Sequence, residues 1–287
     1  MANEGNRVLL AGATGTLGRA LLRALQDRAY QVHPVARPGS IEKLRSAGVA
    51  EADIRIAEVT NAESVSGLCA DVDIVVSALG ITRQQDGLSY DDVDYGANAL
   101  ILQDALRAGV NRFAYVSVLG ADLDLPIPVL RAKFRFEQAL RASGIPWLIF
   151  RPSGFFTDME ELYHMARKGT VHLVGNGRNR ITPIHAADLA ALIVRRLPEG
   201  ESQVAEVGGP ETCTWNEAAR CCFEVLGREP RVMHWPAFLL DAAVGGSRLV
   251  APRWYGVLSF MRFVFTRDQV APELGTTRLK EYLASLS

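Results

Sequence analysis

The chain has 287 residues, 48% hydrophobic and 22% charged, which is enough for one large α/β domain or for one domain with a small lobe. Its formal net charge of −1 gives no electrostatic reason to expect a nucleic acid partner. The four cysteines form no Cys-x-x-Cys pair and have no histidine at metal-ligand spacing, which predicts no metal site and a reducing, cytoplasmic compartment. The polar start of the chain and the lack of a long apolar run predict neither a signal peptide nor a membrane span.

A glycine turn near the N-terminus carries the strongest functional signal. The apolar residues 8–11 are typical of a strand that is buried on both faces. Gly12, Gly15 and Gly18 follow at three-residue spacing, and leucines at helical spacing between residues 17 and 25 predict a helix. A glycine turn between a strand and a helix predicts a phosphate site.

Each glycine of this turn has its own expected role. Gly12 can adopt the backbone angles of a tight turn, and Gly18 lets the helix pack closely on the strand. A side chain at Gly15 would block a pyrophosphate from the amides at the start of the helix, where the helix dipole favours an anion. The alternative is a glycine-rich turn without a ligand, but the strand-turn-helix context favours a dinucleotide.

The second predicted strand, residues 31–36, ends at a residue that bears on cofactor choice. Pro34 lies inside this strand and predicts a local distortion, because proline cannot donate to a ladder. Arg37 follows, roughly 20 residues after the glycine turn, where an acidic residue would bind the adenosine ribose of NAD. An arginine can instead pair with a 2′-phosphate, and Ser40 at the start of the next helix can add a hydroxyl. We therefore predict NADP(H), the alternative being a solvent-facing arginine.

Strands and helices then alternate along the chain. The predicted strands are residues 53–59, 73–78, 112–118 and 146–150, and the predicted helices are 94–108 and 129–142. A capping box at residues 60–63 predicts the start of a further helix, which extends through Leu68. This alternation predicts an α/β fold, a Rossmann-type doubly wound parallel sheet. Ligands of such sheets bind at the carboxyl ends of strands, and Leu79 and Gly80 lie at one of them.

The alternation weakens after residue 153. Residues 154–168 read as a glycine-aromatic loop that continues as a helix, and residues 186–197 read as a second helix. Residues 181–185 read as extended and residues 205–207 as a last strand. A capping box at residues 214–217 opens a helix that should stop at Gly227. We predict an NAD(P)-binding domain over residues 1–209, with 154–180 contributing to the substrate side, and a small, mostly helical substrate or lid lobe over 210–287.

The segment 235–265 is unusually apolar and is interrupted by arginines. Core packing of the small lobe is the simplest interpretation. An apolar wall for a substrate, or a peripheral contact with a membrane surface, are the alternatives. The sequence leaves the oligomeric state open.

Five marks in the sequence together resemble the extended and atypical short-chain dehydrogenase/reductase superfamily. They are Gly-Ala-Thr-Gly-x-x-Gly at residues 12–18, Asp-Ile-Val-Val-Ser at 73–77, Val116-Ser117, Arg151-Pro152, and Pro-Ile-His at 183–185 with Asp188. The chain is most similar to the branch that includes the nucleotide-binding accessory subunit of respiratory complex I and divinyl chlorophyllide reductase. The turn and this resemblance imply cofactor contacts at Gly12, Ala13, Thr14, Gly15, Thr16, Leu17, Gly18, Arg37, Ser40, Glu58, Val59, Ala78, Leu79, Gly80, Lys133, Pro152 and Phe155.

The resemblance also implies a catalytic set of Ser and Tyr-x-x-x-Lys, which this chain carries only in part. Ser117 and Lys133 match the Ser and the Lys, but Val129 occupies the Tyr position and cannot transfer a proton. Tyr115 lies within the fifth strand and cannot easily substitute. The standard tyrosine-dependent mechanism is therefore not expected.

Lys133 has two interpretations. It can be a surface lysine paired with Glu137 at i+4, or it can bind the nicotinamide ribose and, with a lowered pKa, donate the proton. The resemblance favours the ribose contact. His185 and Asp188 are three residues apart, but a carboxylate in the first turn of a helix favours a structural role for this pair.

Together these features predict an NADPH-dependent reductase that acts on a poorly polar small molecule without the usual catalytic tyrosine. One alternative is an NADP(H)-binding sensor or assembly factor that does not turn the cofactor over. A sugar-nucleotide epimerase or dehydratase is a third hypothesis, which the missing tyrosine argues against.

Overall fold

A computed structural model describes residues 6–81 and 87–286. The chain forms two compact units. The first comprises Met1–Arg151 and Leu189–Ala205, and the second comprises Pro152–Asp188 and Glu206–Ser287. The segment assigned to the substrate side from the sequence thus belongs to the second unit. The domain boundary at residue 209 stays a prediction.

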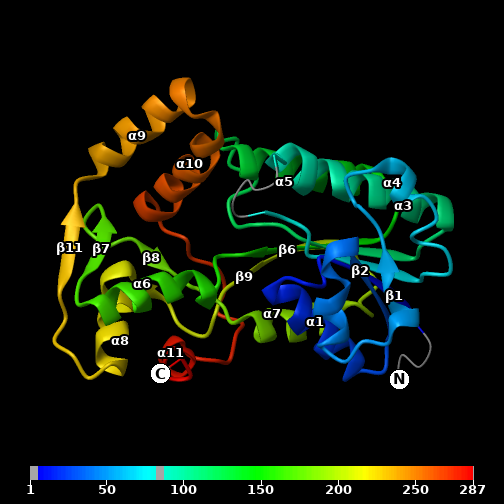
Figure 1. Ribbon diagram of the computed structural model, residues 1–287, viewed down its shortest axis with the longest axis horizontal. Helices are drawn as coiled ribbons and strands as arrows, with labels where there is room; N and C mark the ends of the chain where they lie inside the picture. The colour runs from blue at the N-terminus through cyan, green and yellow to red at the C-terminus, as the bar shows by residue number, and fades with distance from the viewer. Residues whose placement is uncertain (1–5, 82–86, 287) are drawn as a thin grey trace. The chain divides into compact units, whose positions relative to one another are not determined.

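A seven-stranded sheet organises the first unit, in the order β3-β2-β1-β4-β5-β6-β9 (Figure 1). Its strands are β1 (Arg7–Ala11), β2 (Gln31–Ala36), β3 (Arg55–Ile56), β4 (Ile74–Ser77), β5 (Arg112–Val116), β6 (Trp147–Pro152) and β9 (Gln203–Val207). The pairs from β3 across to β6 are parallel. The strand order reverses between β1 and β4, so the predicted doubly wound α/β fold is confirmed.

Helices flank this sheet on both faces. They are α1 (Thr16–Gln26), α2 (Ile41–Arg45), α3 (Ala62–Val65), α4 (Asn98–Ala108), α5 (Pro128–Ala142) and α7 (Ala186–Arg196). Figure 1 shows α4 and α5 against one face of the sheet and α1 and α7 against the other. Every residue of β4 and β5 is buried, as expected for strands covered on both sides.

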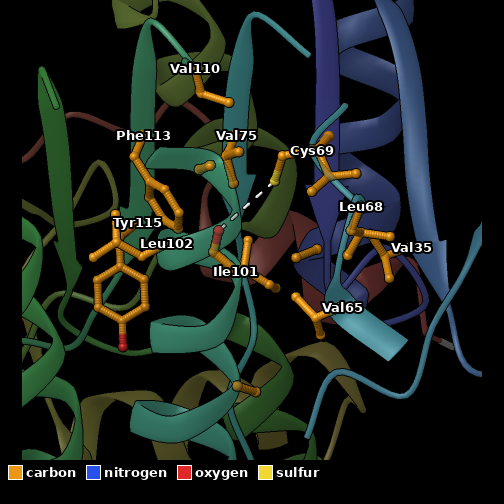
Figure 2. Close-up of a cluster of buried hydrophobic side chains, with 14 of the residues drawn as sticks. Val35, Val65, Leu68, Cys69, Val75, Ile101, Leu102, Val110, Phe113 and Tyr115 are labelled. Carbon is orange, nitrogen blue, oxygen red and sulfur yellow. Dashed lines mark hydrogen bonds between the residues drawn. The ribbon is translucent and has the colours of Figure 1, made fainter. Parts of the chain in front are cut away.

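Between α4 and the sheet, apolar side chains from the helix and from the strands pack together in one core. Ile101 and Leu102 of α4 belong to one apolar cluster with Val75 of β4 and Phe113 of β5 (Figure 2). The buried Cys69 thiol donates to the Ile101 carbonyl at 3.9 Å. Burial raises the pKa of Cys69 to about 12, which suits an inert packing residue rather than a reactive thiol.

Two predicted elements near β3 are shorter in the structure. The strand expected over 53–59 is limited to Arg55–Ile56, because Glu51–Asp53 forms a 3₁₀ turn. The helix expected after it spans only Ala62–Val65, and Asn61 caps it by accepting from the Glu63 N–H at 2.9 Å. The predicted capping box with Thr60 as the cap was therefore wrong.

Two further predictions concern backbone regularity. The helix expected from residue 94 begins earlier, as a π-helical turn over Asp91–Ala97 that α4 continues. The distortion expected at Pro34 does not interrupt β2. The N–H groups of successive residues in a strand point alternately to its two neighbouring strands. The Gln31 N–H donates to Asn6 on the β1 side, so the nitrogen of Pro34, three residues later, faces β3. Pairing with β3 starts only at Val35, so the missing donor breaks no ladder bond.

The second unit combines helices with two small sheets, and the helical C-terminal region predicted from the sequence is confirmed. Its helices are α6 (Phe156–Lys168), α8 (Trp215–Val225), α9 (Ala237–Val250), α10 (Pro252–Thr266) and α11 (Leu279–Ala284). Two small sheets pair β8 (Arg180–Ile181) with β10 (Cys213–Thr214) and β7 (Val171–Val174) with β11 (Val232–Trp235). The strand at 203–207 is therefore not the last one. The capping box of α8 is confirmed, with Thr214 and Glu217 bonding reciprocally.

The apolar segment 235–265 starts at the last residue of β11 and then forms most of α9 and α10. A narrow stripe is buried, with Leu240 9% and Phe263 3% exposed, whereas Phe238 is 65% and Trp254 62% exposed. Core packing thus accounts for only part of this segment. Among the described residues, we find no helix that is both long and apolar enough to cross a membrane.

Candidate functional site

The glycine turn has the geometry of a close-approach site. Gly12 has φ +82°, and a Cβ there would lie 2.8 Å from the Ala78 carbonyl oxygen. A Cβ at Gly18 would overlap the Gly12 carbonyl oxygen. Among the residues that the structure describes, a Cβ at Gly15 would meet nothing closer than that same oxygen, at 3.5 Å. Internal packing therefore requires glycine at positions 12 and 18, but not at position 15.

The start of α1 adjoins Gly15. Gly15 is the N-cap residue and has no side chain to cap the helix, and the first turn of α1 contains no acidic residue. Gly15 and Thr16 are exposed. An uncapped helix start beside an open glycine fits a phosphate group, because amide donors and the helix dipole are both available there.

The loop after β4 adjoins the turn. The Ala78 N–H donates to the Ala11 carbonyl at 3.0 Å, which places residues 78–80 beside the carboxyl end of β1. The strand order reverses between these two strands. Open α/β sheets bind ligands at such a switch point. The structure therefore brings together the predicted contacts of the glycine turn with Ala78, Leu79 and Gly80.

Lys133 lies at the same loop, in a buried ion pair. Its Nζ is 2.9 Å from Asp94 Oδ1, with the Lys133 side chain 12% and the Asp94 side chain 0% exposed. A Cβ at Gly80 would lie 2.7 Å from Asp94 Oδ1 and 3.0 Å from Lys133 Nζ. The interpretation of Lys133 as a surface lysine paired with Glu137 was wrong, because Glu137 pairs with Arg151 and Arg141 instead.

The electrostatics of this pair differ from the expectation. Burial by itself would lower the pKa of Lys133, but Tyr115 and Asp94 outweigh it and raise that pKa. Burial raises the pKa of Asp94, and Lys133 opposes this shift. The lowered pKa that the proton-donor interpretation of Lys133 requires is therefore contradicted. An ammonium with a raised pKa keeps its proton at neutral pH and suits hydrogen bonding better than proton donation.

Ser117 lies in a different buried cluster. Its hydroxyl donates to Glu137 Oε1 at 2.6 Å, and Glu137 also accepts from Arg151 at 2.7 and 3.0 Å. Its proton is thus engaged inside the protein. Val129 is 6% exposed and packs in the core. Tyr115 is fully buried, and its hydroxyl donates to the Asp94 carbonyl at 3.5 Å.

The predicted adenosine-side residues lie at the ends of β2 and β3. Arg37 is exposed directly after β2. Ser40 is the N-cap residue of α2, but its side chain makes no cap hydrogen bond, so the expected hydroxyl cap is absent. Glu58 is half-buried, and its carboxylate accepts from the Thr60 hydroxyl at 3.2 Å. Val59 is buried.

The remaining predicted residues belong to the second unit. Pro152 is buried, and the N–H of Phe155 donates to Asp158 at the start of α6, at 2.9 Å. Asp188 accepts from the backbone and hydroxyl groups of Thr276 and Thr277. Asp188 therefore has a structural role, as expected, because its carboxylate holds the segment before α11 by hydrogen bonds.

Asp94 is the functional candidate that sequence reasoning missed. We expected it only as the first residue of a helix. A signal was present, because Asp94 and Asn98 lie four residues apart and on the same helix face as Leu102. Polar residues on an otherwise apolar face indicate a buried polar contact.

The sequence model of the NAD(P)H-binding family matches residues 12–199. The divinyl chlorophyllide a 8-vinyl-reductase of Oryza sativa subsp. indica is 30% identical over 305 residues, which cover 100% of this chain and 72% of the rice protein. The photosystem II assembly factor Ycf39 of Trieres chinensis is 25% identical over 236 residues, which cover 81% of this chain and 73% of the factor. The resemblance to the branch with divinyl chlorophyllide reductase is therefore confirmed.

Solved structures support the fold. An NADPH-dependent quinone oxidoreductase from Escherichia coli, solved with NADPH, has a TM-score of 0.77 and 20% identity. The superposition covers 97% of this chain and 99% of the oxidoreductase. At this identity the match establishes a shared fold and leaves the reaction open.

Proposed function

The chain belongs to the NAD(P)H-binding family, and from this premise we propose that it is an NADPH-dependent reductase of a poorly polar small molecule. The open space at Gly15 beside an uncapped helix start carries the proposal, because packing does not require glycine there. A bound nicotinamide would supply the hydride. The protein then needs to bind the dinucleotide, orient it and exclude water.

The residues of the first unit divide this task. Amides of the glycine turn would hold the pyrophosphate, and Arg37 would pair with a 2′-phosphate. Lys133 would donate hydrogen bonds to ribose hydroxyls from a fixed, charged ammonium. The preference for NADPH over NADH depends on Arg37, which is exposed where NAD-binding proteins of this fold carry an acid.

The apolar nature of the substrate is supported by the second unit. It exposes Phe238 and Trp254, two large apolar side chains of α9 and α10. The relatives with named substrates act on a chlorophyllide and on quinones, both of which are conjugated and poorly polar. A membrane surface is the alternative occupant of these helices.

A specific observation also supports the second candidate, a cofactor-binding protein without turnover. Ser117 is engaged by Glu137, Lys133 has a raised pKa, and Val129 replaces the expected tyrosine. None of these three candidate positions offers a ready proton. The similarity to an assembly factor supports the same alternative. Both candidates share NADPH binding and differ in turnover.

Two measurements test the proposal in order. NADPH titrated into the purified protein, followed by nucleotide fluorescence and by thermal shift, should saturate and raise the melting temperature. NADPH oxidation is then followed with a panel of quinones, enones and aldehydes. Oxidation with an apolar acceptor supports the reductase. Binding without any oxidation favours the alternative, and absence of binding refutes both.

A further inference from the structure

The π-helical turn Asp91–Ala97 directs one carboxylate into the interior. The Asp94 carbonyl accepts from Asn98 Nδ2 at 3.1 Å and from the Tyr115 hydroxyl at 3.5 Å. Asn98 is itself held, because its Oδ1 accepts from the buried Ser77 hydroxyl at 2.5 Å. Single π-helical turns of this kind are rare and recur at functional sites.

The Asp94 carboxylate is only partly satisfied by hydrogen bonds. Its Oδ2 accepts from the Ile81 N–H at 3.2 Å. Its Oδ1 has no aligned hydrogen-bond donor among the described residues, although the Lys133 ammonium lies 2.9 Å away. A fully buried charged carboxylate is costly unless it is paired with an opposite charge, so Asp94 and Lys133 depend on each other's charge.

The pair lies directly against the loop after β4. Residue 80 must be glycine for this packing, because a Cβ there would come too close to Asp94 Oδ1 and to Lys133 Nζ. Asp94 is completely buried, whereas Lys133 keeps 12% of its side chain exposed. A ligand at this loop could thus reach Lys133 but not Asp94.

We propose that Asp94 is a positioning residue, which keeps Lys133 charged and fixed at the Gly80 loop for contact with the dinucleotide. This inference rests on the proposed function, because it assigns a purpose to the pair within NADPH binding. Asp94 touches neither cofactor nor substrate and acts through Lys133 alone.

The groups that face Lys133 determine what happens without Asp94. Tyr115 from β5 lies with its ring centroid 5.4 Å from Nζ, and the Val116 carbonyl accepts from Nζ at 3.4 Å. Tyr90 precedes the π-helical turn, and burial together with the Asp94 charge raises the pKa of Tyr90 to about 12. Burial raises the pKa of both tyrosines, so at moderate pH they are neutral and the attraction of an ionised Tyr115 is absent. Asp94 is then the anion that keeps Lys133 protonated. Without it, burial lowers the pKa of Lys133.

The test measures NADPH affinity from about pH 7 to about pH 10, by nucleotide fluorescence. The raised pKa of Lys133 lies above this range, so wild-type affinity should stay constant. In Asp94→Asn the ammonium loses its proton as pH rises, and affinity should fall about tenfold across the range. Adding Lys133→Met to Asp94→Asn should give weak binding without pH dependence.

Asp104→Asn is the matched control. Asp104 is another buried carboxylate, 4% exposed, that accepts from the backbone of Gly67 and Cys69. This variant should be destabilised, yet its NADPH affinity should remain independent of pH. A purely structural role of Asp94 predicts the same behaviour for both variants.

The outcomes separate the two proposals. A wild-type protein that does not bind NADPH refutes the proposed function, whereas normal wild-type binding with a flat profile in Asp94→Asn overturns only the role of Asp94. If Asp94→Asn does not fold, an NMR titration of wild-type lysine side chains decides. The pKa of Lys133 must lie above the ordinary lysine value of about 10.4, and an equal or lower pKa overturns the inference.

Discussion

The loop after β4 touches two structures that are built in different ways. At Ala78 it packs against Gly12 of the glycine turn, and at Gly80 it packs against the Asp94–Lys133 pair. The glycine turn is local, because a strand, a turn and a helix within 20 residues define it. The ion pair is non-local and joins the π-helical turn to α5. The glycine turn would offer backbone amides to the cofactor, whereas the ion pair would offer the single charge of Lys133.

The largest expected effect separates ligand binding from folding within the glycine turn. Gly15→Asp should abolish NADPH binding, because it places a side chain and a negative charge where phosphate must approach. The fold should persist, because within the described part of the chain a Cβ at Gly15 meets only the Gly12 oxygen, at 3.5 Å. Nucleotide fluorescence and thermal unfolding measure both.

Gly18→Ala is the contrasting variant. Its Cβ would overlap the Gly12 backbone, so it should lower the free energy of unfolding by about 2–4 kcal/mol. Unchanged NADPH affinity in a folded Gly15→Asp protein would remove the pyrophosphate assignment.

The same distinction explains what could be predicted from sequence. The sheet, the glycine turn and the α8 capping box follow from short-range patterns, such as Gly12 at a strand end and Glu217 three residues after Thr214. Asp94 was missed because its partner, Lys133, is distant in the sequence and no local pattern joins the two. The burial of Ser117 against Glu137 was missed for the same reason.

Elements that depend on tertiary contacts were also difficult to predict. The two-residue strands β3, β8 and β10 have too few residues to show a period of two. The exposure of Phe238 and Trp254 could not be predicted, because an apolar run normally indicates burial.

The next effect concerns the adenosine end of the site. Arg37→Ala should weaken NADPH binding roughly ten- to hundredfold and leave NADH binding almost unchanged, since a charge-assisted contact with phosphate contributes about 1.5–3 kcal/mol. Titration of both nucleotides against wild type and variant measures this. Equal wild-type affinities for the two nucleotides would show that Arg37 does not select between them.

A smaller effect is expected at the Gly80 loop. Gly80→Ala places a methyl group 2.7 Å from Asp94 Oδ1, so either the loop or the ion pair must shift. NADPH affinity should fall by about tenfold, with a loss of about 1–2 kcal/mol in the free energy of unfolding. Gly87→Ala is the control, because a Cβ there meets no described residue within 4 Å. It carries its own strain at φ +77°, so it should cost stability and spare NADPH affinity.

The smallest expected effect on binding tests whether Ser117 has kept a catalytic role. Its hydroxyl is 4% exposed and donates to Glu137, so Ser117→Ala removes one hydrogen bond from a buried cluster. The free energy of unfolding should fall by about 1–2 kcal/mol, and NADPH affinity should not change. Any NADPH oxidation should also continue at the wild-type rate, because Arg151 still holds Glu137 in place. If oxidation collapses while stability and affinity stay intact, Ser117 acts on the substrate and must exchange its bond to Glu137 during the reaction.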